Sequence, residues 1–142
     1  MNRQVSSRPR GQTLIEFAII LPVLLFILVV IFDLGRAVYY YSVLTNVARE
    51  GARYGSVESS ATNANIQAHA LSFAYGVDLL LGDIVVDKAV TTTVTVGGTT
   101  RQEINVTVVV DYDYVPITPY VDRLLSGGVI NIRTTARMGR EY

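Results

Sequence analysis

The sequence predicts an α+β fold in which a long N-terminal helix packs on a small antiparallel β-sheet. Three observations support this prediction. An unbroken apolar run covers residues 17–32, hydrophobic residues then recur at three- and four-residue steps as far as Gly55, and from Asp83 onward their spacing changes to two. The first two patterns are typical of a helix, and the third of strands with one buried face. With 142 residues, one folded domain and a membrane anchor are expected.

The apolar run has the length of a membrane span. Residues 17–32 would extend about 24 Å as a helix, and a start at Leu14 gives about 28 Å, close to the hydrocarbon thickness of a bilayer. Pro22 would kink this helix without ending the hydrophobic segment. Three arginines and no acidic residue lie in residues 1–10. This charge pattern predicts a cytoplasmic N-terminus and places everything after the run outside.

The residues after the run favour a retained anchor over a cleaved secretory signal. The apolar segment is long for a signal, and residues 32–37 contain no Ala-x-Ala cleavage site. Asp33 closes the run. Tyr39, Tyr40 and Tyr41 follow just beyond it, where tyrosine side chains favour the interface between membrane and water.

Helical spacing outlasts the apolar run. One helix of about 40 residues, from near Thr13 to near Gly55, is expected, with a length of roughly 60 Å. Its second half contains the small residues Ala48, Gly51, Ala52 and Gly55. Glycine inside a helix costs about 0.5 to 1 kcal/mol relative to alanine. Close packing against another element would explain Gly51, whereas Gly55 is expected to cap the end of the helix.

The remainder of the chain predicts a small α+β domain. Apolar residues occupy the even positions of its strands, so one sheet face should be buried, and the long helix is the obvious cover. The expected elements are a loop (56–62), a short helix (63–75), a strand from Asp83, a turn at Gly97-Gly98, a strand over 104–114, one or two helical turns at 119–126, and a last strand after Gly127-Gly128.

The sequence contains no convincing catalytic or metal-binding pattern. Cysteine is absent, which excludes disulfides, thiolate catalysis and cysteine metal sites. His69 is the only histidine and has no acid or nucleophile at a suggestive spacing. Asp111 and Asp113 share one strand face, but no calcium-loop pattern surrounds them, so a solvated face is favoured. With a net charge of zero and one lysine, Lys88, no basic surface for nucleic acid is expected either.

Two motifs resemble a known family. A short basic leader ends in Gly11, and after four residues Glu16-Phe17 opens the apolar helix. This arrangement resembles the processing site of type IV prepilins and pseudopilins. The helix then continues through residues 33–36 (Asp-Leu-Gly-Arg) and 46–54 (Asn-Val-Ala-Arg-Glu-Gly-Ala-Arg-Tyr). Over residues 11–55 the combination is similar to the TadE-like family of minor pseudopilins, which belong to tight-adherence (Flp-type) pilus systems.

The resemblance implies a pilin-like layout and a set of functional residues. A prepilin peptidase would cut between Gly11 and Gln12, and Glu16 and Phe17 would act in assembly. The Glu16 carboxylate would pair with the N-terminal ammonium of a neighbouring subunit, which would offset part of the desolvation of both charges. A position near the headgroups, without a specific role, is the alternative for Glu16. The implied segments are a leader (1–11), a long helix (12–55) with a transmembrane part at about 14–36, and an extracytoplasmic domain (56–142).

These implications define an expected function. The chain would be a structural, non-enzymatic minor pseudopilin without cofactors, crossing the bacterial cytoplasmic membrane once with its C-terminus outside, or carried into the surface pilus. Its partners would be the membrane, a prepilin peptidase, other pilins or pseudopilins and the assembly platform, with neither nucleic acid nor a small-molecule substrate. The alternative is an unprocessed single-pass membrane protein whose outer domain binds a ligand or adheres. Cleavage after Gly11 distinguishes the two.

Overall fold

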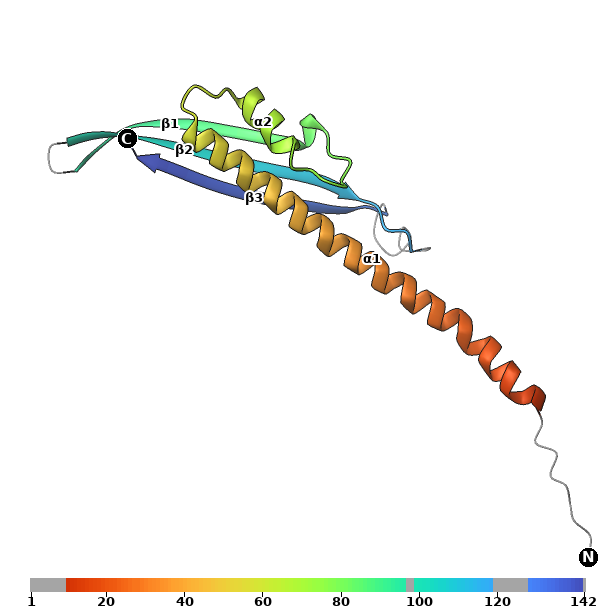
Figure 1. The fold of residues 1–142 in the computed structure, drawn as a ribbon. Helices are drawn as coiled ribbons and strands as arrows, with labels where there is room; N and C mark the ends of the chain where they lie inside the picture. The colour runs from red at the N-terminus through yellow and green to blue at the C-terminus, as the bar shows by residue number, and fades with distance from the viewer. Residues whose placement is uncertain (1–9, 97–98, 119–127, 142) are drawn as a thin grey trace, which may run out of the picture.

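A computed structural model describes residues 10–96, 99–118 and 128–141, and it has the expected α+β fold (Figure 1). A long helix extends far beyond a small sheet that lies against its C-terminal half. The elements are α1 (Arg10–Val57), α2 (Asn63–Leu71), the 3-10 helix η1 (Leu81–Asp83), β1 (Ile84–Val96), β2 (Thr99–Tyr114) and β3 (Ile130–Glu141). The turn expected at residues 97–98 and the helical turns expected at 119–126 lie outside the described residues.

The three described strands form one antiparallel sheet in the order β1-β2-β3. Ile84 pairs with Val110 in the first ladder, and Tyr114 pairs with Ile130 in the second. Among the strand residues with described side chains, the even positions face α1 and α2, as the period of two predicts, and the odd positions are exposed or half-buried. The buried sheet residues with described side chains are Ile84, Val86, Ile104, Val106, Val108, Val110, Tyr114 and Thr134.

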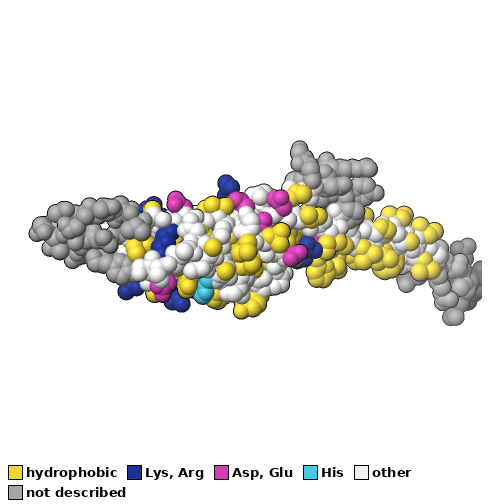
Figure 2. Space-filling view, turned by 90° about the horizontal axis from the view of Figure 1, so that it is seen from above, with side chains coloured by type: hydrophobic (Ala, Val, Ile, Leu, Met, Phe, Trp, Pro, Cys, Tyr) yellow, Lys and Arg dark blue, Asp and Glu magenta, His cyan; other side chains and the backbone are white. Residues whose placement is uncertain are grey.

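Helix α1 has two halves with different environments. Leu44, Val47, Ala48 and Ala52 lie in the hydrophobic core with the sheet. Every large hydrophobic side chain from residue 14 to residue 28 is at least 37% exposed, because no described part of the chain covers that half. Figure 2 shows the resulting sheath of apolar side chains on the extended part of the helix. α1 is the one helix in the described part of the chain that is long and apolar enough to cross a membrane.

Helix α2 closes the outer edge of β1. Two of its side-chain amides, Asn63 and Gln67, donate to the carbonyl oxygens of Val86 (3.2 Å) and Ile84 (2.7 Å). Lys88 occupies an inward-facing position of β1 and breaks its apolar pattern because its ammonium group donates to the carbonyls of Glu58, Ser59 and Ala61, at 2.9, 3.0 and 3.0 Å. Unpaired strand edges invite pairing with other chains. At the outer edge of β1, the side-chain amides of Asn63 and Gln67 occupy two of the carbonyl groups that another strand would use.

Two predicted helix ends are wrong. The short helix was expected to reach residue 75, but α2 ends at Leu71. The N–H groups of Phe73 and Ala74 donate to carbonyls three residues back, which tightens the chain into a turn that does not continue the α-helix. The cap expected at Gly55 is also wrong, because α1 continues to Val57. Gly55 is buried inside the helix, where a side chain would collide with Ile66 and Val106. Its role in the fold is packing.

Candidate functional site

The residues of the expected processing and assembly site lie in the first turns of α1. Gly11, Gln12, Glu16 and Phe17 are all exposed. The Gln12 side-chain amide donates to Glu16 Oε1 at 3.2 Å, across one helical turn. A methyl group added at Gly11 would meet no atom within 4 Å. Packing inside the chain therefore gives no reason for a glycine at this position, and recognition by another protein would.

The small residues of α1 lie where the helix approaches α2 and the sheet most closely. Ala48 and Ala52 belong to the core. A Cβ atom on Gly51 would lie 2.9 Å from the Cβ of Ala70 in α2. One on Gly55 would lie 2.6 Å from Ile66 Cδ1. Both distances are shorter than van der Waals contact, so both glycines permit this approach.

The structure also shows a polar cluster at the end of the apolar run, which the sequence analysis did not single out. Asp33 is only 8% exposed, although it lies next to exposed apolar residues. Its carboxylate accepts the backbone N–H groups of Ile117 (3.0 Å) and Thr118 (2.6 Å) and the hydroxyl of Thr118. The Tyr114 hydroxyl donates to the Asp33 carbonyl oxygen at 3.0 Å. The carboxylate thus binds the end of β2 and the loop that follows it.

Arg36, one turn later, completes this cluster. Its Nη2 donates to the Val115 carbonyl at 3.0 Å, and the guanidinium lies 5.0 Å from the ring centre of Tyr114 and 5.5 Å from that of Tyr40. Such distances allow cation–π attraction. Arg36 Nε is buried without a hydrogen-bond partner among the described residues. We call Asp33, Arg36, Tyr40, Tyr114 and Thr118 the joint cluster.

The tyrosines beyond the apolar run differ from one another in environment. Tyr40 packs edge-on against Tyr112 and Tyr114, with ring centres 5.6 and 5.5 Å apart. The Tyr39 hydroxyl donates to the Tyr75 carbonyl at 2.9 Å. Tyr39, Tyr40 and Tyr41 were all expected at the interface between membrane and water. This prediction is wrong for Tyr40, because Tyr40 lies on the side of α1 that faces the sheet.

The protonation of the joint cluster favours a stable structural contact between α1 and the loop 115–118. Burial raises the pKa of the Tyr114 phenol, and the nearby negative charge of Asp33 raises that pKa further. Tyr114 therefore remains a protonated donor near neutral pH. Because donors already surround the Asp33 carboxylate, the arrangement holds the helix against the loop 115–118 and offers no free base or nucleophile.

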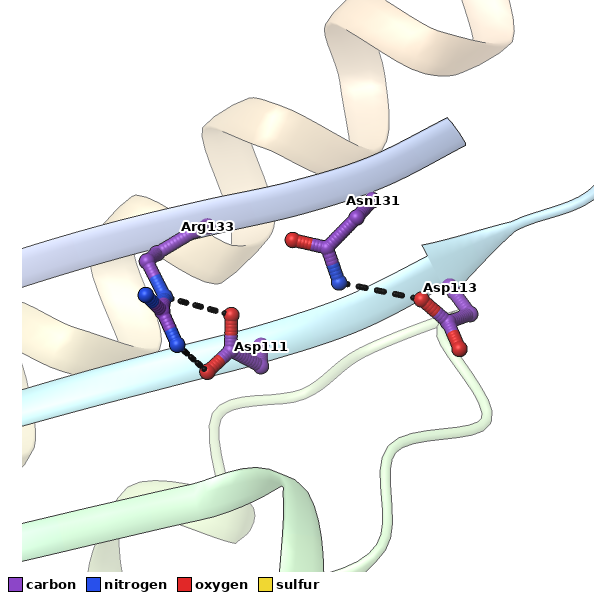
Figure 3. A network of polar contacts seen from close by, with 4 residues as sticks. All are labelled: Asp111, Asp113, Asn131 and Arg133. Carbon is purple, nitrogen blue, oxygen red and sulfur yellow. Dashed lines mark hydrogen bonds and ion pairs between the residues drawn. The ribbon is translucent and has the colours of Figure 1, made fainter. Parts of the chain in front are cut away.

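The other polar residues form ordinary surface and packing contacts. Arg133 donates through Nε and Nη2 to both carboxylate oxygens of Asp111, at 2.7 Å each, and Asn131 donates to Asp113 at 3.0 Å (Figure 3). The hydrogen bonds from Arg133 lower the pKa of Asp111, as does its positive charge. His69 stacks on the Tyr54 ring with centres 4.2 Å apart. The described residues include no cluster of three or more metal-ligating side chains.

The comparison with protein families confirms the resemblance seen in the sequence. The model of the TadE-like protein family matches residues 11–53. This segment contains the expected processing motif, the apolar half of α1, and both Asp33 and Arg36. The searches of curated proteins and of solved structures found no match. The family match supports a protein associated with tight-adherence pili, and the single apolar helix fits a single-pass membrane anchor.

Proposed function

From the match to TadE-like proteins and the uncovered apolar half of α1, we propose that this chain is a minor pseudopilin of a tight-adherence pilus. It is a structural component, and a prepilin peptidase processes it between Gly11 and Gln12. One observation carries the proposal. The segment that matches the family, residues 11–53, contains the apolar half of α1, which the described part of the chain leaves exposed, and it ends in the half of α1 that packs on the sheet. A helix that is apolar all round needs lipid or other helices around it.

The proposed orientation follows from the two ends of the apolar segment. The arginines of residues 1–10 stay in the cytoplasm, and the sheet lies outside. From Glu16 to Asp33 the helix extends about 26 Å, which is close to the hydrocarbon thickness of a bilayer. Glu16 then lies at the cytoplasmic boundary of the lipid and Asp33 at the outer one, so neither charge needs to cross the centre of the membrane.

Cleavage after Gly11 requires the start of α1 to unwind. Helix α1 begins at Arg10, and proteases bind substrates as extended chains. Terminal turns are the easiest to open because their backbone groups lack helical partners. Glycine at position 11 lowers the helical stability of this turn by about 1 kcal/mol relative to alanine. It also leaves the backbone accessible, since no side chain is present.

Glu16 is well placed to act on the new terminus. Its Oε1 already lies 3.2 Å from the Gln12 side-chain amide, so the carboxylate and residue 12 are on the same side of the helix. After cleavage, Gln12 would carry an ammonium group. An ammonium from a neighbouring subunit would replace the neutral amide with a charged donor, which makes a stronger hydrogen bond. The pair would align adjacent anchors in one register.

Processing is tested by the intact mass of the membrane-extracted chain, expressed with and without its prepilin peptidase. We expect a loss equal to the mass of residues 1–11 that depends on the peptidase and disappears in Gly11→Leu, because a bulky residue blocks the cleavage site. Gly35→Leu, at another open glycine of α1, should be cut normally. An unchanged mass with an active peptidase would refute processing and make the anchored binding or adhesion protein the better hypothesis.

The assembly role predicts a different effect for Glu16. Glu16→Gln should be processed normally but enter the sheared pilus fraction, or a cross-linked complex with other pilus subunits, at least about tenfold less, which corresponds to about 1.4 kcal/mol. The lost interaction is the pairing of the Glu16 carboxylate with the ammonium of a neighbouring subunit at the cytoplasmic boundary of the lipid. Glu50→Gln changes a carboxylate that pairs with Arg53 on the outer half of the same helix, and it should assemble normally. If Glu16→Gln assembles normally, the Glu16 carboxylate has no role in assembly.

A further inference from the structure

Among the described side chains of the outer domain, most exposed large apolar residues lie at one end. Six of them lie in short segments next to strand ends: Leu80 and Leu81 before β1, Val115 and Ile117 after β2, and Val129 and Ile130 at the start of β3. Their exposed fractions range from 38% to 69%. We call these six residues the apolar collar. Among the described side chains of residues 57–141, the exposed large apolar residues outside the collar are Val57 at the end of α1, Tyr75, and Val85 near the start of β1.

The sheet topology brings the collar to the level of Asp33. Both outer strands pair with β2 in antiparallel fashion, so both begin near its C-terminal end. β3 begins opposite Tyr114, where Ile130 pairs with it, and β1 begins four residues earlier along β2, where Ile84 pairs with Val110. The Tyr114 hydroxyl, at the end of β2, donates to the Asp33 carbonyl. The segments next to the end of β2 and the start of β3 therefore lie beside α1 where its apolar run stops. The segment before β1 lies at the same end of the sheet. In Figure 1 the sheet ends at this level, and α1 continues alone toward the N-terminus.

On the side of β2 and β3, the collar is continuous with the apolar surface of α1. A hollow of about 740 Å³ lies between Ile117 and the helix, where Val29, Ile31 and Phe32 line it. A second hollow, of about 200 Å³, lies between Ile130 and the helix and is lined by Val30, Leu34 and Pro116 among others. Both are open and mainly apolar. The polar groups that border the hollows are Asp33, whose carboxylate accepts hydrogen bonds from Ile117 and Thr118, and Arg36, whose Nη2 donates to the Val115 carbonyl. Acyl chains that cover the helix could extend along the apolar walls of both hollows.

We propose that the apolar collar is seated in the outer interface of the bilayer that α1 crosses, so that lipid covers both the anchor and the lower end of the domain. The inference rests on the proposed membrane anchor. Lipid is the occupant because the collar adjoins the surface that lipid must cover, at the depth where the hydrocarbon ends. Asp78 and Asp83 lie near this end and would repel anionic headgroups. The attraction is therefore apolar, and anionic lipid is not needed for it.

The chain itself offers a clean test because it contains no tryptophan. Single-tryptophan variants of the full-length protein would be reconstituted into vesicles of phosphatidylcholine brominated near the top of the acyl chains. Ile117→Trp and Leu80→Trp report on two sides of the collar, at side chains 69% and 65% exposed. Phe26→Trp reports on the anchor. Val57→Trp, on the same helix and 56% exposed, serves as the distant control, about 36 Å beyond Asp33.

We expect bromolipid to quench both collar tryptophans about twofold more than Val57→Trp, because the interface admits aromatic side chains and the far end of the domain lies in water. If Phe26→Trp is quenched but both collar variants are quenched no more than Val57→Trp, the proposed seating of the collar in the bilayer is wrong. The proposed membrane anchor would still stand. No quenching at Phe26→Trp would show that α1 is not in the bilayer, and would overturn the anchor and the collar together.

Discussion

Replacing Asp33 with alanine is expected to lower the free energy of unfolding of the full-length chain by about 3 kcal/mol. The physical reason is the number of donors that lose their acceptor. The backbone N–H groups of Ile117 and Thr118 and the Thr118 hydroxyl all donate to the Asp33 carboxylate. The site is too buried for water to replace the carboxylate fully. The loop 115–118 should detach from α1 as a consequence. Chemical unfolding in detergent micelles, followed by tyrosine near-ultraviolet circular dichroism, measures the effect.

Two further variants make this result specific to the joint cluster. Asp33→Asn keeps one acceptor oxygen and should lose an intermediate amount of stability. Asp113→Ala removes an exposed carboxylate with one bond to Asn131, and it should unfold like the unsubstituted chain. Amide hydrogen exchange at Ile117 and Thr118 should accelerate in Asp33→Ala before global unfolding. If Asp33→Ala matches Asp113→Ala in both measurements, the carboxylate does not hold the loop.

The architecture was predictable because its signals are local and periodic. The even residues of β2 remain apolar from Ile104 to Val110, which fixes the buried face of the central strand before any pairing is known. The apolar run of residues 17–32 indicates an uncovered helix for the same reason. The resemblance at Gly11 and Glu16 depends equally on neighbouring residues. In each case the information lies within one element.

The joint cluster was not predictable because its partners come from distant parts of the chain. Asp33 and Thr118 are 85 residues apart, and no local pattern indicates that a loop will bring its N–H groups to this carboxylate. The available signal was weak: an acidic residue closes an apolar run, and Arg36 follows one turn later. Tyr40 and Gly55 were misassigned for the same reason. Their contacts are with β2 and α2, and the pattern around each of them fits a second interpretation equally well.

The close approach of α1 to α2 makes a second strong prediction. Gly51→Leu should destabilise the full-length chain by about 3 kcal/mol, because an enlarged side chain in a filled core forces neighbouring elements apart. The first added atom would already lie 2.9 Å from Ala70 Cβ, which is attached directly to the backbone of α2 and cannot rotate away. Gly35→Leu is the matched control in the same helix. It places a side chain where nothing lies within 4 Å, and it should not destabilise the chain.

A double-mutant cycle identifies the colliding pair. Gly51→Ala alone should lower the free energy of unfolding even though alanine favours a helix by about 1 kcal/mol over glycine. Ala70→Gly removes the opposing Cβ, at the cost of a glycine within α2. If these two atoms collide, the double variant will lose less stability than the two single variants combined, because the substitutions exchange one methyl group across the contact. Additive effects, or a stabilised Gly51→Ala, would show that the space beside Gly51 accepts a side chain and that close packing does not require the glycine.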